Sequence, residues 1–256
     1  MKYDLSLVVP SIRTHLMHQL YDTAELSCDR HSFEIVICGP YEPPKELLEK
    51  ENFRWIQDWG SPSRASQIAS IHARGDYLYH TTDDVRFKKG QISNAFDLAK
   101  PDVIVACKYS EWYEYEEISM PEDYWVLKGL PCYKGEGFEQ LNQEWGCFCQ
   151  FIVNTKLFQY YGGFDAENFE YLNHVCHDFL FRVQRDGIKT VESNEYVCNA
   201  RWLQAFQEDH GPIYQSQIYS DLPKFNAMWG TPNDRKIIDY DNYERAEEKW
   251  SRRFGE

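Results

Sequence analysis

Short apolar segments alternate with helical patterns along the first 107 residues, and this alternation constrains the fold more than any other feature of the chain. Apolar runs predict strands at 5–9, 33–38, 53–57, 77–81 and 102–107. Apolar residues at helical spacing predict helices at about 14–27, 43–50 and 62–74. Strands that alternate with helices are typical of a parallel sheet covered by helices. We therefore expect an α/β fold with an open, mainly parallel sheet.

The helix expected at 62–74 carries a start signal and a stop signal. Ser61 is a favourable N-cap, and Pro62 suits the first helical position. Gly75 suits the left-handed position that closes a helix. The strand that follows leads to two adjacent carboxylates, Asp83 and Asp84. This segment therefore predicts a helix, a glycine stop, a strand and an acidic strand end.

Three predicted strands end in residues that suit a binding site, namely Pro10-Ser11, Gly39-Pro40 and Asp83-Asp84. Open α/β sheets bind ligands beyond the carboxyl ends of their strands. Two carboxylates at such an end can present a divalent metal to a phosphorylated ligand, with phosphate oxygens and water completing the shell. A nucleotide diphosphate suits this arrangement. A plain acidic turn is the alternative, because Asp is common where strands end.

The bulk composition narrows the class of protein. The chain has 256 residues, of which 43% are apolar and 16% aromatic, which favours a folded globule over disorder. Its net charge of −14 disfavours binding to nucleic acid and to anionic membranes. No stretch approaches the roughly 20 apolar residues that a membrane span needs, and the first ten residues do not resemble a signal peptide. We expect a cytoplasmic protein whose eight cysteines are mostly buried, reduced thiols, with a disulfide or zinc role as the alternative.

The pattern changes after residue 108. Residues 109–144 are aromatic and acidic with little periodicity, which is typical of a long functional loop. Aromatic platforms suit sugar rings, and the alternative is that these side chains pack a lid onto the domain. A strand at 147–153, the sequence Gly162-Gly163-Phe164-Asp165 and a helix at 173–186 closed by Gly187 follow. The charged segment 239–256 predicts a helical tail.

Taken in order, these motifs resemble the family 2 glycosyltransferases of GT-A fold over roughly residues 4–190. The resemblance rests on Val8-Val-Pro10, Phe33-Glu-Ile-Val-Ile, Ala73-Arg-Gly75-Asp-Tyr-Leu, Thr82-Asp83-Asp84, Gly162-Gly-Phe-Asp165 and His177-Asp178. It implies a single GT-A domain with a mainly parallel sheet, in which a Rossmann-like half binds the nucleotide and a second half binds the acceptor. It also implies an Asp-x-Asp motif that binds Mn²⁺ or Mg²⁺ and the sugar-nucleotide diphosphate.

Carried over by position, Asp84 matches the second acid of the metal motif and Asp178 matches the catalytic base. The chain also departs from the family pattern. Thr82 stands at the first acid, so the resemblance assigns the metal to Asp83 and Asp84. The strand at 33–38 ends in Cys38-Gly39-Pro40, where the family has acids that hold the nucleotide base. His177 replaces a Glu, and Gln67 replaces an Asn.

Further site residues follow from this resemblance. We expect Pro10, Ser11, Arg13 and Gly39 to line the nucleoside pocket and Arg64 to contact the diphosphate, with Asp83 beside them. His210 is the candidate third metal ligand. For any one of these residues the alternative is an ordinary structural or solvated position. The implied donor is a nucleotide-diphosphate sugar, with a UDP-sugar favoured.

The sequence therefore predicts a metal-dependent, inverting glycosyltransferase that acts on a nucleotide sugar and on a carbohydrate or other hydroxyl acceptor. Residues 1–107 would form the nucleotide-sugar half of a single GT-A domain, 108–200 the acceptor half, and 201–256 a C-terminal extension. The alternative from another class is a catalytically silent GT-A-like protein that binds a carbohydrate or a partner. A nucleotidyltransferase is disfavoured, because no Gly-rich basic loop follows the first strand.

Overall fold

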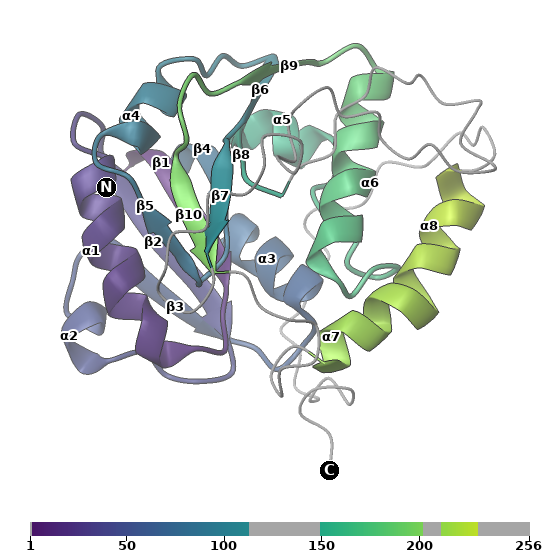
Figure 1. The fold of residues 1–256 in the computed structure, drawn as a ribbon, viewed down its shortest axis with the longest axis horizontal. Helices are drawn as coiled ribbons and strands as arrows, with labels where there is room; N and C mark the ends of the chain where they lie inside the picture. Colours follow the sequence, from purple (N-terminus) through teal and green to yellow (C-terminus); the bar gives the residue numbers. More distant parts are fainter. Residues whose placement is uncertain (1, 113–148, 202–210, 230–256) are drawn as a thin grey trace.

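A seven-stranded sheet forms the centre of the molecule (Figure 1). The computed structural model describes residues 2–112, 149–201 and 211–229. Across the sheet the strands are β3 (Phe53–Gln57), β2 (Phe33–Gly39), β1 (Tyr3–Pro10), β4 (Gly75–His80), β8 (Phe151–Asn154), β6 (Val103–Ala106) and β9 (Lys189–Glu192). Neighbouring strands pair in parallel except at β8, which is antiparallel to both β4 and β6. The expected α/β fold with a mainly parallel sheet is confirmed.

Helices cover both faces of this sheet (Figure 1). One face packs against α1 (Met17–Ser27), α2 (Lys45–Leu48) and α4 (Gln91–Phe96). The other face packs against α3 (Pro62–Ile71), α5 (Thr155–Tyr160), α6 (Leu172–Arg185) and α8 (Leu222–Trp229). Alternate residues of β1 divide between the two cores, with Leu7 on one side and Val8 on the other. Strands buried on both faces explain the nearly continuous apolar runs in the sequence.

A smaller sheet lies beside the first one and has the order β5 (Val85–Phe87), β10 (Cys198–Arg201) and β7 (Tyr109–Trp112). β10 pairs antiparallel with β5 and parallel with β7. β7 therefore falls at the start of the segment 109–144, for which the sequence indicated a loop. The rest of that segment, Cys147 and the predicted tail at 239–256 lie outside the described residues.

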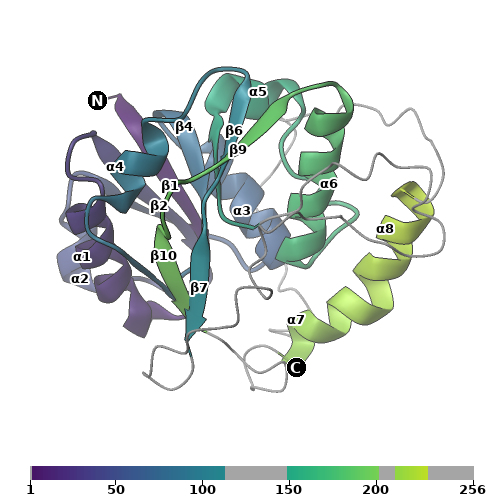
Figure 2. The ribbon, with the colours of Figure 1, turned by 45° about the horizontal axis from the view of Figure 1, so that its top comes forward.

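The C-terminal helices continue on the α6 side of the molecule (Figure 2). α7 (Gly211–Ser216) leads through a π-helical segment (Gln217–Asp221) into α8. Phe225 of α8 packs against Phe181 of α6, with ring centroids 5.6 Å apart. Within the residues that the structure describes, no helix has the length and apolar character needed to cross a membrane.

Local signals in the sequence explain most of the element boundaries. Ser61 caps α3 by accepting a hydrogen bond from the Arg64 amide, and Pro62 is the first helical residue, as predicted. Helices 43–50 and 14–27 are shorter than expected: Pro43 and Pro44 delay the start of α2, and a 3₁₀ turn (Thr14–Leu16) precedes α1. The strand expected at 147–153 begins at residue 151 as β8.

Gly75 differs from its predicted role. α3 ends at Ile71, with His72 as its C-cap, so Gly75 does not close the helix and instead begins β4. A side chain at Gly75 would place its Cβ 2.6 Å from the Ser6 amide nitrogen of the adjacent β1. The glycine is therefore required by close strand packing. Among the described glycines, a positive φ occurs at Gly90, Gly162, Gly163 and Gly187.

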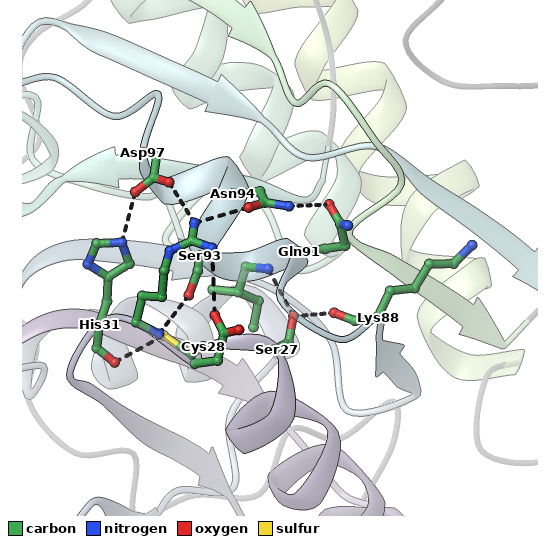
Figure 3. Close-up of polar contacts among 11 residues, drawn as sticks. Ser27, Cys28, His31, Lys88, Gln91, Ser93, Asn94 and Asp97 are labelled. Atoms are coloured by element: carbon green, nitrogen blue, oxygen red, sulfur yellow. Dashed lines mark hydrogen bonds and ion pairs between the residues drawn. The ribbon is translucent and has the colours of Figure 1, made fainter.

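Polar contacts at the amino end of β2 fasten the α1–β2 turn to α4 (Figure 3). We call Arg30, His31, Asn94 and Asp97 the amino-edge network. Arg30 Nη2 donates to Asp97 Oδ2 over 2.6 Å and to Asn94 Oδ1 over 3.0 Å. His31 Nε2 lies 2.9 Å from Asp97 Oδ1. Because Arg30 and His31 directly precede β2, the network lies at the edge of the sheet opposite Gly39, the last residue of this strand.

Candidate functional site

The carboxyl ends of β3, β2, β1 and β4 meet at one edge of the sheet, because these four strands are parallel neighbours. Backbone hydrogen bonds continue past the strand ends. The Ser11 amide donates to the Cys38 carbonyl over 3.0 Å, and the Thr81 amide donates to the Val8 carbonyl over 3.3 Å. The loops after these strands are therefore held side by side at the edge where open α/β sheets bind ligands.

Ser11, Arg13, Asp83 and Asp84 form what we call the strand-end cluster. Ser11 Oγ donates to Asp83 Oδ2 over 2.7 Å, and Arg13 Nη1 donates to Asp83 Oδ1 over 2.6 Å. The Arg13 amide also donates to Ser11 Oγ over 3.1 Å. The structure therefore brings together three residues that the sequence assigned to the nucleotide pocket. Asp83 joins the loop after β1 to the turn after β4.

Asp84 faces the same guanidinium at a longer distance. Its Oδ2 lies 4.0 Å from Arg13 Nη1, and its side chain is 12% exposed. Burial raises the pKa of Asp84, and the neighbouring Asp83 charge raises that pKa further, while Arg13 opposes both effects. Asp84 is therefore a carboxylate that gains from any additional positive charge placed beside it.

The two carboxylates of the predicted metal motif differ in their hydrogen bonds. Both oxygens of Asp83 already accept hydrogen bonds from Ser11 and Arg13. Asp84, by itself or together with Asp83, has the donor atoms that Mg²⁺ and Mn²⁺ prefer, because such ions are commonly held by one or two carboxylates together with water and substrate phosphate. No group of three His, Cys, Asp or Glu side chains suited to a metal occurs in the described part of the chain. His210 lies outside the described residues.

Gly39 lies directly beneath the strand-end cluster. A Cβ at this position would fall 1.8 Å from the Ser11 carbonyl oxygen, so only glycine allows β2 to end here against the loop after β1. Pro10 is the last residue of β1 and is half-buried. These two residues shape the backbone at the site, and neither supplies a charged group.

Asp58 is a site residue that the sequence reasoning missed. It follows β3 directly, and its side chain is buried. Its Oδ1 accepts a hydrogen bond from the Gly60 amide over 2.7 Å and lies 3.4 Å from Arg64 Nε. Arg64, expected at the diphosphate, is thus held at the start of α3 by an acid at a strand end. The signal was present, because an Asp directly after a strand is the same pattern that identified Asp83.

The Gly162–Phe164 turn is attached to α3 by Gln67. Gln67 Nε2 donates to the Gly162 carbonyl over 3.2 Å, and its Oε1 accepts from the Phe164 amide over 2.8 Å. Gly162 and Gly163 have φ values of 73° and 67°, which explains the paired glycines. Gln67 thus connects α3 to the turn that follows α5.

Asp178 is fully buried within α6, and both of its oxygens are hydrogen-bonded. Arg182 Nε donates to Oδ2 over 3.0 Å, and Trp229 Nε1 of α8 donates to Oδ1 over 2.9 Å. Arg182 also donates to the carbonyls of Tyr161 and Gly163. Asp178 is therefore part of a buried node that joins α6, α8 and the glycine turn. We call Asp178, Arg182 and Trp229 the α6 node.

Comparisons with known proteins identify the fold. No protein-family model matches the chain, and no curated protein matches it. Among solved structures, the chain is similar to S. aureus TarS, with a TM-score of 0.55 and 13% identity over 90% of this chain. A structure of TarS residues 1–349 in complex with UDP is similar, with a TM-score of 0.53 and 14% identity over 90% of this chain.

The similarity covers 43% of the first TarS chain and 70% of the shorter one, so this chain spans less than half the length of the former. At this identity the similarity describes the architecture alone. The chain therefore has a GT-A-like α/β fold, similar over most of its length to that of TarS.

Proposed function

We propose that this protein is a glycosyltransferase that moves a sugar from a nucleotide-diphosphate sugar to an acceptor hydroxyl, with a UDP-sugar as donor. The observation that carries the proposal is the strand-end cluster. Its serine, arginine and acids gather where four parallel strands end. A structural neighbour of the same fold was solved in complex with UDP. The order of motifs that resembles the family 2 enzymes supports the same reading.

The donor would bind across the strand-end cluster. Arg13 and Arg64 would place positive charge near the diphosphate, while Pro10 and Gly39 would border the nucleoside. Asp84 would hold Mn²⁺ or Mg²⁺ together with diphosphate oxygens, and such an ion would supply positive charge to the leaving group. Asp83 would position Ser11 and Arg13 through the hydrogen bonds that its oxygens accept, and it would join Asp84 at the metal through its remaining lone pairs.

The transfer step needs a base that accepts the acceptor's hydroxyl proton while its oxygen attacks the anomeric carbon and the nucleoside diphosphate leaves. We keep Asp178 as the candidate base of an inverting reaction. In that role its Oδ1 must exchange the Trp229 indole for the acceptor hydroxyl. The division into a donor half at 1–107, an acceptor half at 108–200 and an extension at 201–256 belongs to the same proposal.

The enclosed position of Asp178 favours one alternative. If the hydrogen bonds from Trp229 and Arg182 to Asp178 never open, this carboxylate cannot accept a proton from an acceptor, and the predicted position holds no base. The protein would then be a catalytically silent GT-A-like module that binds a sugar nucleotide, a carbohydrate or a partner. Nucleotide binding alone does not separate the two functions, whereas turnover of a sugar nucleotide does.

The test measures binding and turnover on the same samples. Calorimetric titration with UDP, GDP and ADP, with and without Mn²⁺, identifies the nucleotide, and release of UDP from UDP-glucose and UDP-N-acetylglucosamine measures turnover. Arg13→Met removes the charge at the strand-end cluster. Arg30→Met is the matched control, because it breaks an arginine–aspartate pair of equal length at the opposite edge of the sheet.

We expect Arg13→Met to weaken UDP binding at least about 10-fold, as expected for loss of a charged contact. Arg30→Met should bind UDP like the wild type. UDP release that is lost in Asp178→Asn supports the transferase with Asp178 as its base. Binding without release supports the silent module. If none of the three nucleotides binds in either condition, the proposed donor site is wrong.

A further inference from the structure

Two aromatic side chains stand just beyond the carboxyl ends of β2 and β3. β2 ends at Gly39 and β3 ends at Gln57, so Tyr41 and Trp59 each lie two residues past a strand end. Their ring centroids are 5.6 Å apart, and the rings are nearly perpendicular, with an interplanar angle of 79°. Tyr41 is 46% exposed, while Trp59 is half-buried. An aromatic pair with one exposed ring therefore lies at the same sheet edge as the strand-end cluster.

The backbone between β2 and the exposed tyrosine is held by β3 and by the residue after it. The Gly39 carbonyl accepts hydrogen bonds from Trp55 Nε1 over 3.1 Å and from the Asp58 amide over 3.2 Å. Gln57 Nε2 donates to the Pro40 carbonyl over 3.2 Å. This part of the chain thus has a defined position before any ligand arrives, which lowers the entropy cost of binding.

The turn that carries Trp59 is equally defined. Asp58 Oδ1 accepts a hydrogen bond from the Gly60 amide over 2.7 Å, which closes the backbone around Trp59. A Cβ at Gly60 would lie 2.4 Å from Arg64 Cδ, so the turn also packs against the first turn of α3. The ring contact between Trp59 and Tyr41 is therefore part of a fixed surface.

The aromatic pair lies on the β2 and β3 side of the strand-end cluster. Across this part of the sheet the order is β3, β2, β1 and β4, with neighbouring strands about 4.8 Å apart. The proposed diphosphate site is at Asp84, after β4, and the nucleoside would border Pro10 and Gly39, at the ends of β1 and β2. A nucleotide that lies along the edge in this direction brings its base to the residues after β2 and β3, where Tyr41 is exposed.

The end of β2 favours stacking over hydrogen bonding as the way to hold a base. Cys38, Gly39 and Pro40 carry no charged side chain, and Cys38 is buried. The Gly39 carbonyl already accepts two hydrogen bonds, which occupy both of its lone pairs. An aromatic side chain can bind a base through its π-face instead, and such stacking works with every base.

We propose that the Tyr41 ring stacks on the nucleobase of the donor. The inference rests on the proposed nucleotide-sugar site and assigns the residue that binds the base there. Tyr41 contributes through its ring, so a phenylalanine can replace it. It contacts the base and not the diphosphate, so it strengthens the binding of nucleoside diphosphates and leaves the binding of pyrophosphate unchanged.

The test compares UDP with pyrophosphate by calorimetric titration in the presence of Mg²⁺. Tyr41→Ala should weaken UDP binding about 5- to 100-fold, as expected for loss of a base–aromatic stack, and should bind pyrophosphate like the wild type. Tyr41→Leu should lose most of the same affinity, because it keeps an apolar side chain without a π-face. Tyr41→Phe should bind both ligands like the wild type. Circular dichroism confirms that each variant is folded.

Tyr160→Ala is the matched control. Tyr160 is 65% exposed, and its ring centroid lies 5.2 Å from that of Tyr161 at an interplanar angle of 83°, so it belongs to a similar aromatic pair. Its helix, α5, begins beside the amino end of β4, where Thr155 Oγ1 donates to the Gly75 carbonyl over 2.8 Å. We expect this variant to bind UDP like the wild type.

The outcomes separate this inference from the proposed function. If the wild type binds UDP and Tyr41→Ala binds it equally well, the stacking role is wrong and the proposed function stands. Equal losses for UDP and pyrophosphate in Tyr41→Ala would overturn the assigned contact with the base, and so would equal affinity for UDP in Tyr41→Leu and Tyr41→Phe. If the wild type binds no nucleotide, the proposed donor site fails, and the role of Tyr41 fails with it.

Discussion

Two buried arginine–aspartate pairs occupy the two halves of this molecule, and they are built in opposite ways. Arg13 and Asp83 are 70 positions apart in the chain and meet because β1 and β4 are adjacent in the sheet. Arg182 and Asp178 are four positions apart on a single helix. The first pair lies at the edge where strands end, with Asp84 beside it. The second lies in the core and is capped by Trp229.

The comparison shows that the same two residue types serve different purposes. In the strand-end cluster, the Arg13 guanidinium faces two carboxylates, and the Arg13 side chain is 10% exposed at the edge where we propose that the ligand binds. In the α6 node, the Arg182 guanidinium donates hydrogen bonds to the Asp178 carboxylate and to two backbone carbonyls. We therefore expect the first pair to matter more for ligand binding and the second more for stability.

The largest effect should come from Arg182→Met. The variant leaves the Asp178 carboxylate buried beside an apolar side chain and leaves two carbonyls without their donor. Breaking a buried pair in this way costs about 3–5 kcal/mol of unfolding free energy. Urea unfolding followed by circular dichroism measures the loss. Arg185→Met is the control on the same helix, because this arginine is partly exposed and pairs with the adjacent Asp186, so it should cost less than about 1 kcal/mol. Equal losses in both variants would contradict the assigned role of the α6 node.

Gln67→Leu tests the connection between the two halves. The substitution leaves the Gly162 carbonyl and the Phe164 amide without their side-chain partner in a buried turn. Unpaired buried groups cost about 1–3 kcal/mol each, and we expect a total loss of about 3 kcal/mol in the same unfolding assay. A variant as stable as the wild type would show that the turn holds its shape without Gln67.

Arg13→Met should be milder for stability than Arg182→Met. It removes a charged hydrogen bond at a less enclosed position, and we expect a loss of about 2 kcal/mol in the unfolding assay. Arg13→Met should weaken UDP binding more than Arg182→Met does. The comparison between the two pairs fails if Arg13→Met destabilises the fold more than Arg182→Met does.

His80→Phe should have the smallest effect and the opposite sign. His80 is enclosed by Phe151, Phe158 and Phe164, with ring centroids 4.6 to 4.8 Å away. Neither ring nitrogen has a hydrogen-bond partner among the described residues. A phenylalanine at this position removes two unpaired ring nitrogens from the core. We therefore expect a gain of about 1 kcal/mol at pH 7.

The same variant should change the pH dependence of stability. Burial lowers the pKa of His80 to about 3, so the folded protein keeps it neutral while the unfolded chain protonates it below about pH 6.5. Between those values the unfolded state binds more protons, so the wild type loses stability relative to His80→Phe as the pH falls. The difference grows by up to about 1.4 kcal/mol per pH unit. Unfolding curves at pH 7, 6 and 5 measure this slope, and parallel pH profiles would contradict the neutral, buried imidazole.

Local sequence patterns were sufficient for much of the architecture. The apolar runs predicted β1, β2, β3 and β6 within two residues at each end. The runs of β1 and β2 are clear because strands buried on both faces need apolar side chains over most of their length. Ser61-Pro62 and Gly187 marked their helix ends through capping and a positive φ. Gly75 was misread, since a glycine required by close strand packing has the same sequence signature as one that closes a helix.

The sequence predicted some features of the candidate site, and the tertiary structure determined the others. The sequence by itself determined which residues stand at the carboxyl ends of the strands, because strand order along the chain and the acidic strand end are local features. Only the tertiary structure decided what those residues do. Asp83 binds Ser11 and Arg13, Asp58 holds Arg64, and Asp178 is enclosed by Trp229, through contacts between segments far apart in the chain. Such contacts depend on which strands and helices become neighbours, and a local pattern carries no information about its distant partner.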